Sequence, residues 1–145
     1  MKNRSGRLLA LGIAIVATGS HAAETSEAAL EAHMSAINTL ETDRIVSTQH
    51  FPFTHLWPDG RSDHQPTAAD FEPIDPAVLG SEWHHSVLDD AEEIARTETS
   101  VTYLIAFSRH REDDSRIGRY RAIWIATQVG GDWRVQFRHG ALPID

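Results

Sequence analysis

Three side chains that can exchange a proton lie close together in the sequence. His55, Asp63 and His64 flank the turn signal Pro58-Asp59-Gly60. An imidazole titrates near neutral pH, so a histidine can take up and return a proton during a reaction. These groups face one another only if the segments on either side of the turn pair as a hairpin. His55 and Asp63 are therefore candidate bases, with a structural or surface role as the alternative for each.

A second group of candidates lies in the C-terminal half. The Tyr120 hydroxyl and the Arg109 guanidinium could bind a ligand carbonyl or carboxylate. A mainly apolar pocket needs aromatic walls around such groups. The predicted wall consists of Trp57, Trp83, Phe107 and Trp124. The alternative is that the aromatic residues are ordinary core and that Arg109 pairs with an acid.

A metal or cofactor site is not predicted. The chain has nine histidines, but His84 and His85 are adjacent in a predicted strand, which would direct them to opposite faces. A zinc site needs three or four converging ligands, and the sequence has no His-x-His or His-Glu-x-x-His motif. The absence of cysteine excludes thiolate ligands, disulfides and a cysteine nucleophile.

Short elements must position the N-terminal candidates. Apolar residues at helical spacing predict a helix over Glu24–Leu40, capped by Thr25 or Ser26. A short helix is predicted over Arg44–His50, because the residue before Pro52 avoids the helical region. The hairpin that carries the acid–base candidates is predicted over Phe53–Trp57 and Arg61–Gln65. Short helical turns are expected at residues 67–71 and 76–79.

Long strands form the rest of the chain. Glu82–Leu88 is predicted to begin the sheet, with Asp89–Glu93 as either a bulge or an edge. Three antiparallel strands follow, at Thr99–His110, Gly118–Val129 and Trp133–His139, the last two joined through Gly130-Gly131-Asp132. These strands are apolar on both faces, and such strands are usually covered on both. We expect helices on one face and a second copy of the chain on the other, giving a homodimer through the outer sheet face.

The N-terminus predicts export. Three basic residues precede an apolar run over Leu8–Gly19, and small residues follow it at Ser20-His21-Ala22. This is the pattern of a cleaved secretory signal peptide, so we expect residues 1–22 to be removed and residues 23–145 to form one domain in the periplasm or outside the cell. Loss of three basic residues takes the net charge from −8 to −11. Such an acidic surface argues against binding nucleic acid or an anionic membrane.

The order of these elements resembles the nuclear transport factor 2-like superfamily, which includes SnoaL-like and ketosteroid isomerase-like proteins. The resemblance rests mainly on Ala106-Phe107-Ser108-Arg109, Gly118-Arg119-Tyr120, Trp124-Ile125-Ala126-Thr127 and the segment Asp132–Arg138. These look like the closing strands of an uncharacterised bacterial branch. The resemblance implies an α+β fold in which a strongly bent antiparallel sheet wraps around N-terminal helices to form a cone with a pocket.

The resemblance leaves the activity open, because one fold hosts many functions. Isomerases of this superfamily use a carboxylate base near the first hairpin, where this sequence has Trp57. The first hypothesis is therefore an exported domain that binds a small apolar or weakly acidic molecule. The second is a cofactor-free isomerase, dehydratase or cyclase, with His55 or Asp63 as base and Tyr120 as donor. The third is a non-catalytic module for oligomerisation or interaction.

Overall fold

The computed structural model describes residues 23–145, so the predicted signal peptide lies outside the described residues. The helical elements are α1 (Ser26–Thr39), α2 (Thr42–Val46) and the 3-10 turns η1 (Ala68–Asp70) and η2 (Pro76–Leu79). The strands are β1 (Gln49–Leu56), β2 (Ser62–Gln65), β3 (His85–Arg96), β4 (Ser100–His110), β5 (Arg116–Val129) and β6 (Asp132–Pro143). None of the helices in this part of the chain is long and apolar enough to cross a membrane.

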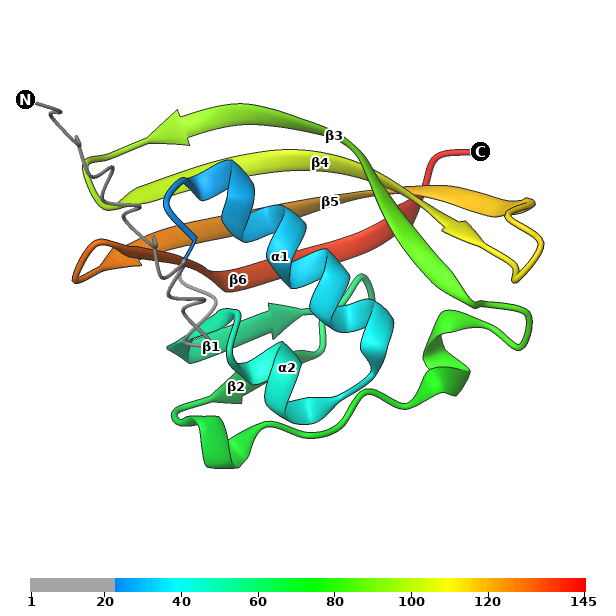
Figure 1. The fold of residues 1–145 in the computed structure, drawn as a ribbon, viewed down its shortest axis with the longest axis horizontal. Helices are drawn as coiled ribbons and strands as arrows, with labels where there is room; N and C mark the ends of the chain where they lie inside the picture. Colours follow the sequence, from blue (N-terminus) through cyan, green and yellow to red (C-terminus); the bar gives the residue numbers. More distant parts are fainter. Residues whose placement is uncertain (1–22) are drawn as a thin grey trace, which may run out of the picture.

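One six-stranded sheet organises the molecule, with the strand order β2-β1-β6-β5-β4-β3. Strands β3 to β6 form an antiparallel meander, and β1 joins β6 in parallel before β2 closes the edge. The sheet bends around α1, which crosses its inner face, while α2 contacts α1 and β1 (Figure 1). The predicted α+β architecture, with a bent sheet wrapped around N-terminal helices, is confirmed.

Helix α1 forms for the reasons that the sequence suggests. The Thr25 side chain accepts a hydrogen bond from the Ala28 amide (3.1 Å), which satisfies one of the free N–H groups of the first turn. Leu30, Met34 and Ile37 repeat at helical spacing and are buried. They pack against the inner face of the meander, where Val101, Tyr103, Ile105, Phe107, Trp124 and Val135 complete the core.

The predicted hairpin is confirmed, and its register is Phe53↔Gln65 through Leu56↔Ser62. The predicted helix over Arg44–His50 is wrong at its C-terminal end. Helix α2 ends at Val46 and β1 begins at Gln49, before the proline. The Val135 amide donates to the Thr48 carbonyl (3.1 Å), and Gln49 pairs with Val135. The conformation of this segment is therefore set by its pairing with a strand far along the chain, rather than by the local proline signal.

Bulges shape the long strands. Strand β3 lies at the sheet edge and has register shifts between Leu88 and Asp90 and between Glu93 and Ala95, so it shows both predicted features. Strand β6 continues beyond the predicted end at His139 as far as Pro143. Its pairing with β5 also shifts register twice, and these shifts decide which of its side chains face inward.

Candidate ligand-binding cavity

A cavity of about 320 Å³ lies between α1, the inner face of the sheet and the segment 71–79 that contains η2. Helix α1 contributes Met34 and Ile37, and strands β4 and β5 contribute Phe107 and Trp124. Its polar side chains include Asp63 on β2, His55 on β1, Arg138 on β6 and Arg109 on β4. This combination of an apolar wall with a few polar groups is typical of a small-molecule site.

Four of the lining side chains occupy one row across the sheet. Asp63 on β2 is opposite His55 on β1, His55 is opposite Arg138 on β6, and Arg138 is opposite Trp124 on β5. Neighbouring strands are about 4.8 Å apart, so each side chain in the row is next to the one before it. The sheet register therefore places an acid, an imidazole, a guanidinium and an indole side by side.

His55 is held in one tautomer by the backbone. Its Nε2–H donates to the Gly140 carbonyl (3.1 Å), which leaves Nδ1 as a hydrogen-bond acceptor. Burial, with a further contribution from the nearby Arg138 charge, lowers the pKa of His55 to about 4. The imidazole is therefore neutral at physiological pH.

Asp63 is bound to an aromatic neighbour. The Trp57 indole Nε1–H donates to its Oδ2 (2.7 Å), and the Trp57 ring lies against His55 with centroids 4.1 Å apart. The Arg61 guanidinium also lies over the Trp57 ring, 4.8 Å from its centroid. These contacts hold the two strands of the hairpin together next to its turn. They also occupy one carboxylate oxygen of Asp63.

Arg138 is the deepest charged group in the row. Its guanidinium lies over the Phe53 ring, 5.5 Å from the centroid, and its Nε is buried without a hydrogen-bond partner. Burial lowers the pKa of Arg138 to about 10, so the side chain remains protonated at neutral pH. Within residues 23–145, no carboxylate lies within 4.0 Å of it.

His33 lies behind this row, on α1. Thr48 donates its hydroxyl hydrogen to the Ile45 carbonyl (2.7 Å) and so accepts a hydrogen bond from His33 Nδ1–H (2.7 Å). The ring packs edge-on against Trp124, with centroids 5.1 Å apart. Burial, reinforced by the Arg138 charge, lowers the pKa of His33 well below its usual value. Both histidines are therefore neutral, and neither adds a charge beside Arg138.

The structure brings most of the predicted site residues to the cavity. His55, Asp63, Trp57, Phe107, Arg109 and Trp124 all line it. Trp83 and Tyr120 are not among its lining residues. Trp83 Nε1–H donates to Ser86 Oγ (3.0 Å), and Tyr120 stacks on Phe107 with centroids 5.4 Å apart. The predicted donor Tyr120 therefore does not share the cavity with His55, and the ligand-binding roles stay predictions.

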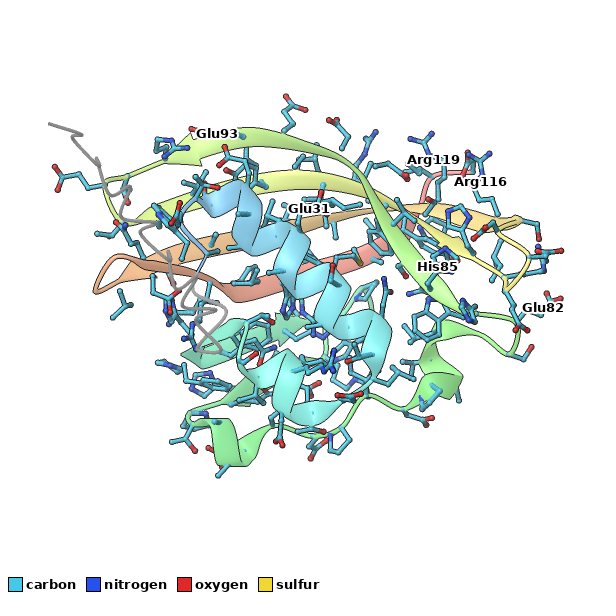
Figure 2. The ribbon with its side chains drawn as sticks, in the orientation of Figure 1. Glu31, Glu82, His85, Glu93, Arg116 and Arg119 are labelled. Atoms are coloured by element: carbon cyan, nitrogen blue, oxygen red, sulfur yellow. The ribbon has the colours of Figure 1, made fainter. Side chains whose placement is uncertain are left out.

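The expectation that His84 and His85 point to opposite faces is wrong. Strand β3 begins at His85, so His84 lies outside the strand alternation, and the two Nδ1 atoms are 3.1 Å apart. His85 also stacks on His110, and it lies at the same end of the molecule as Arg116 and Arg119 (Figure 2). The part of the chain that the structure describes holds no group of three or more His, Asp or Glu side chains arranged to hold a metal ion.

Arg138 is a charged lining residue that the sequence does not predict. In β6, Val135 is opposite Ala126, but Phe137 is opposite Ile125, so Gln136 has no partner in β5. This bulge reverses the inward–outward alternation, and Arg138 faces inward where strict alternation would place His139. Gln136 itself accepts from Thr127 Oγ1 (2.8 Å) and donates to the Pro52 carbonyl (2.9 Å). No local sequence signal marks this bulge.

Solved structures share this arrangement of helices and strands. A protein from Thiobacillus denitrificans described as a calcium/calmodulin-dependent protein kinase type II association domain superposes with a TM-score of 0.64 and 17% identity, over 83% of this chain and 96% of that one. An NTF2-like protein from Cytophaga hutchinsonii superposes with a TM-score of 0.58 and 13% identity, over 80% and 93%. The chain has the nuclear transport factor 2-like fold.

Other proteins with the nuclear transport factor 2-like fold have different descriptions. A ketosteroid isomerase-like protein from Erwinia carotovora superposes with a TM-score of 0.59 and 12% identity, over 83% of this chain and 94% of that one. No protein-family model matches the sequence, and no curated protein is significantly similar to it. The likeness therefore establishes the fold, and the function has to be argued from the cavity itself.

Proposed function

We propose that this nuclear transport factor 2-like domain binds a small, mainly apolar molecule in the cavity between α1 and the inner face of the sheet. One observation carries the proposal: the protein's own side chains leave about 320 Å³ free there, in the size range of ligand pockets. Met34, Ile37, Phe107 and Trp124 supply an apolar wall around this space. Protein cores are otherwise close-packed, so a space of this size beside the core can hold a small molecule.

Binding is favoured over catalysis by the state of His55. A general base works best when its pKa is near the working pH, and burial lowers the pKa of His55 to about 4. The predicted partner Tyr120 stacks on Phe107 and is not a lining residue. The acid–base pair of the enzyme hypothesis is therefore not assembled, and the cavity is better suited to holding a molecule than to transforming it.

A bulky substitution at the cavity opening tests this proposal without changing the core. Val78 lies on η2, lines the cavity and is 50% exposed, so Val78→Trp can place an indole across the opening. A neutral apolar probe, 2-naphthamide, should bind the wild-type protein and bind the variant roughly tenfold more weakly, a loss of about 1.4 kcal/mol. Isothermal titration calorimetry measures both affinities.

Val129→Trp is the matched control. Val129 ends β5, is 62% exposed and does not line the cavity, so this variant adds the same side chain elsewhere. It should bind 2-naphthamide as the wild type does. Absence of binding to the wild-type protein, or equal losses in the two variants, would contradict the proposal.

We also propose that two copies pair through the outer sheet face. Leu104 on β4, Ile123 and Ile125 on β5 and Phe137 on β6 lie on the side opposite the buried core residues, and all four are only partly buried. Helix α1 packs on the inner face and cannot cover them. Some structural neighbours are described as association domains, which supports self-assembly as the role of this face.

The proposed location is the periplasm or the cell exterior, supported by the basic residues and apolar run within residues 1–22. Native mass spectrometry of full-length protein expressed with its own leader tests all three proposals together. A chain that begins at Ala23, in pairs, with a co-purifying small molecule is the expected result. A protein that retains residues 1–22 would contradict the export proposal.

A further inference from the structure

The arginines of this chain divide into two groups by their partners. Within the described residues, most arginines have a carboxylate within 4.0 Å. Among residues 23–145, only Arg109, Arg121 and Arg138 have none, and two of these three, Arg109 and Arg138, line the cavity. A buried cation without a partner is costly, so a guanidinium that the fold leaves unpaired inside a cavity calls for an explanation.

Arg138 has fewer partners than Arg109 among the described residues. The Nε of each arginine is buried without a hydrogen-bond partner, and Phe53 covers one face of the Arg138 guanidinium. Arg109 is better satisfied, because its guanidinium lies 4.4 Å from the centroid of the Tyr120 ring and donates to the Leu79 carbonyl (3.3 Å). In the row across the sheet, Arg138 is therefore the side chain whose N–H donors most lack acceptors.

The acids that line the cavity do not neutralise Arg138. Asp63 lies two strands away in the row, and Trp57 binds its Oδ2. Asp75 caps η2 by accepting from the Ala77 amide (2.9 Å), and both Asp75 and Glu72 are exposed on the covering segment. The neighbouring His55 directs its Nε2–H to Gly140 and carries no charge at neutral pH. A positive charge therefore remains at the base of an apolar space.

We propose that Arg138 is the anion-binding subsite of this cavity and that the ligand is a small apolar carboxylate. A guanidinium matches a carboxylate through two parallel N–H···O bonds, and such charge-assisted bonds are among the strongest that a binding site offers. The apolar body of the ligand would lie against Trp124, Phe107 and Met34. This inference rests on the proposed function, since it names the chemical class that the cavity binds.

The test compares two probes of the same shape, 2-naphthoate and the neutral 2-naphthamide, by isothermal titration calorimetry. The wild-type protein should bind the carboxylate more tightly than the amide. Arg138→Gln should weaken binding of 2-naphthoate roughly 10- to 100-fold, the range expected for one charge-assisted pair. It should change binding of 2-naphthamide less than about threefold, because the amide does not use the charge.

Arg121→Gln is the matched control. Arg121 is the third arginine without a carboxylate partner, but it is exposed and is paired with Ala106 on the outer side of the sheet. Its replacement removes the same charge from the neighbouring strand and should leave both affinities unchanged. An equal loss of 2-naphthoate binding in both variants would assign the effect to net charge and overturn the proposal.

The remaining outcomes also separate the two proposals. If the wild-type protein binds 2-naphthamide but prefers it to 2-naphthoate, the anion subsite is wrong while the apolar binding function stands. If neither probe binds, the proposed function itself fails. Arg138→Lys keeps the charge but loses the paired N–H geometry, so it should fall between the wild type and Arg138→Gln. This variant provides the same test if Arg138→Gln does not fold.

Discussion

At the scale of single residues, the cavity is defined by groups whose charge is set by burial. His55 is neutral because burial lowers its pKa to about 4, while Arg138 remains charged because its pKa falls only to about 10. The same burial therefore removes the charge of an imidazole and leaves that of a guanidinium, since their intrinsic pKa values differ by several units. This difference gives the row across the sheet its single unpaired cation.

The shift of His55 predicts how stability depends on pH. The folded protein holds fewer protons at His55 than the unfolded chain does between the folded pKa of about 4 and the unfolded value near 6.5, so stability should fall as the pH drops through this range. From pH 7 to about pH 5, this group alone should cost about 2 kcal/mol of the free energy of unfolding. His55→Gln keeps a donor for Gly140 and should remove that part of the loss.

Urea unfolding at both pH values measures the effect. His64→Gln is the control, because His64 lies on the same hairpin but is exposed, with Nδ1 near Thr54 Oγ1. The control should lose as much stability on acidification as the wild type. The assignment to His55 is wrong if His55→Gln retains the full wild-type loss.

At the scale of elements, two register shifts in β6 determine which of its groups line the cavity. The bulge at Gln136 turns Arg138 inward. A second register shift, between the pairs Ile123↔His139 and Arg121↔Leu142, surrounds Gly140, whose carbonyl accepts the bond from His55. Gly140 has φ 112, a left-handed conformation that glycine adopts without strain.

Two glycine variants separate backbone strain from close packing. A Cβ on Gly140 would lie 3.1 Å from the Arg121 carbonyl oxygen, whereas a Cβ on Gly80, at φ 104, would meet nothing within 4 Å. Both Gly140→Ala and Gly80→Ala should lose about 1–2 kcal/mol of stability to backbone strain. Gly140→Ala should lose about 1 kcal/mol more, because the backbone of β5 must move. Thermal unfolding measures both losses, and equal losses would show that the contact at Gly140 does not matter.

At the scale of the whole molecule, the two faces of the sheet differ in what covers them within residues 23–145. Helix α1 crosses the inner face (Figure 1), where the cavity also lies. The outer face presents the partly buried apolar residues on β4, β5 and β6. Thr102, Ile125 and Phe137 lie in one row on this side, and Leu104, Ile123 and His139 lie in the next. If a second copy covers these rows, a charge placed there should keep the copies apart.

Leu104→Glu tests this arrangement. The wild-type protein should elute with twice the protomer mass in size-exclusion chromatography with light scattering, and the variant should elute as a monomer, because a carboxylate in an apolar interface is unpaired. Val129→Glu, at the exposed end of β5, should leave the pairing intact. A wild-type monomer would contradict the proposed interface.

Much of the fold follows from local patterns in the sequence. The apolar spacing of Leu30, Met34 and Ile37 and the cap at Thr25 predict α1, and the Pro58-Asp59-Gly60 turn predicts the hairpin. Along β4, Val101, Tyr103, Ile105 and Phe107 recur at every second position and share the buried face. These features depend on neighbours within a few residues, so they can be identified without the tertiary structure.

The sequence alone determined the class of the fold, the hairpin that carries His55 and Asp63, and most of the aromatic wall. Only the tertiary structure decided that β1 pairs with β6, that Tyr120 stacks on Phe107 and is not a lining residue, and that Arg138 faces inward. The physical reason is that bulges and parallel pairing depend on contacts between residues far apart in the chain. A one-residue shift in register moves a side chain to the other face, and no local pattern encodes that shift.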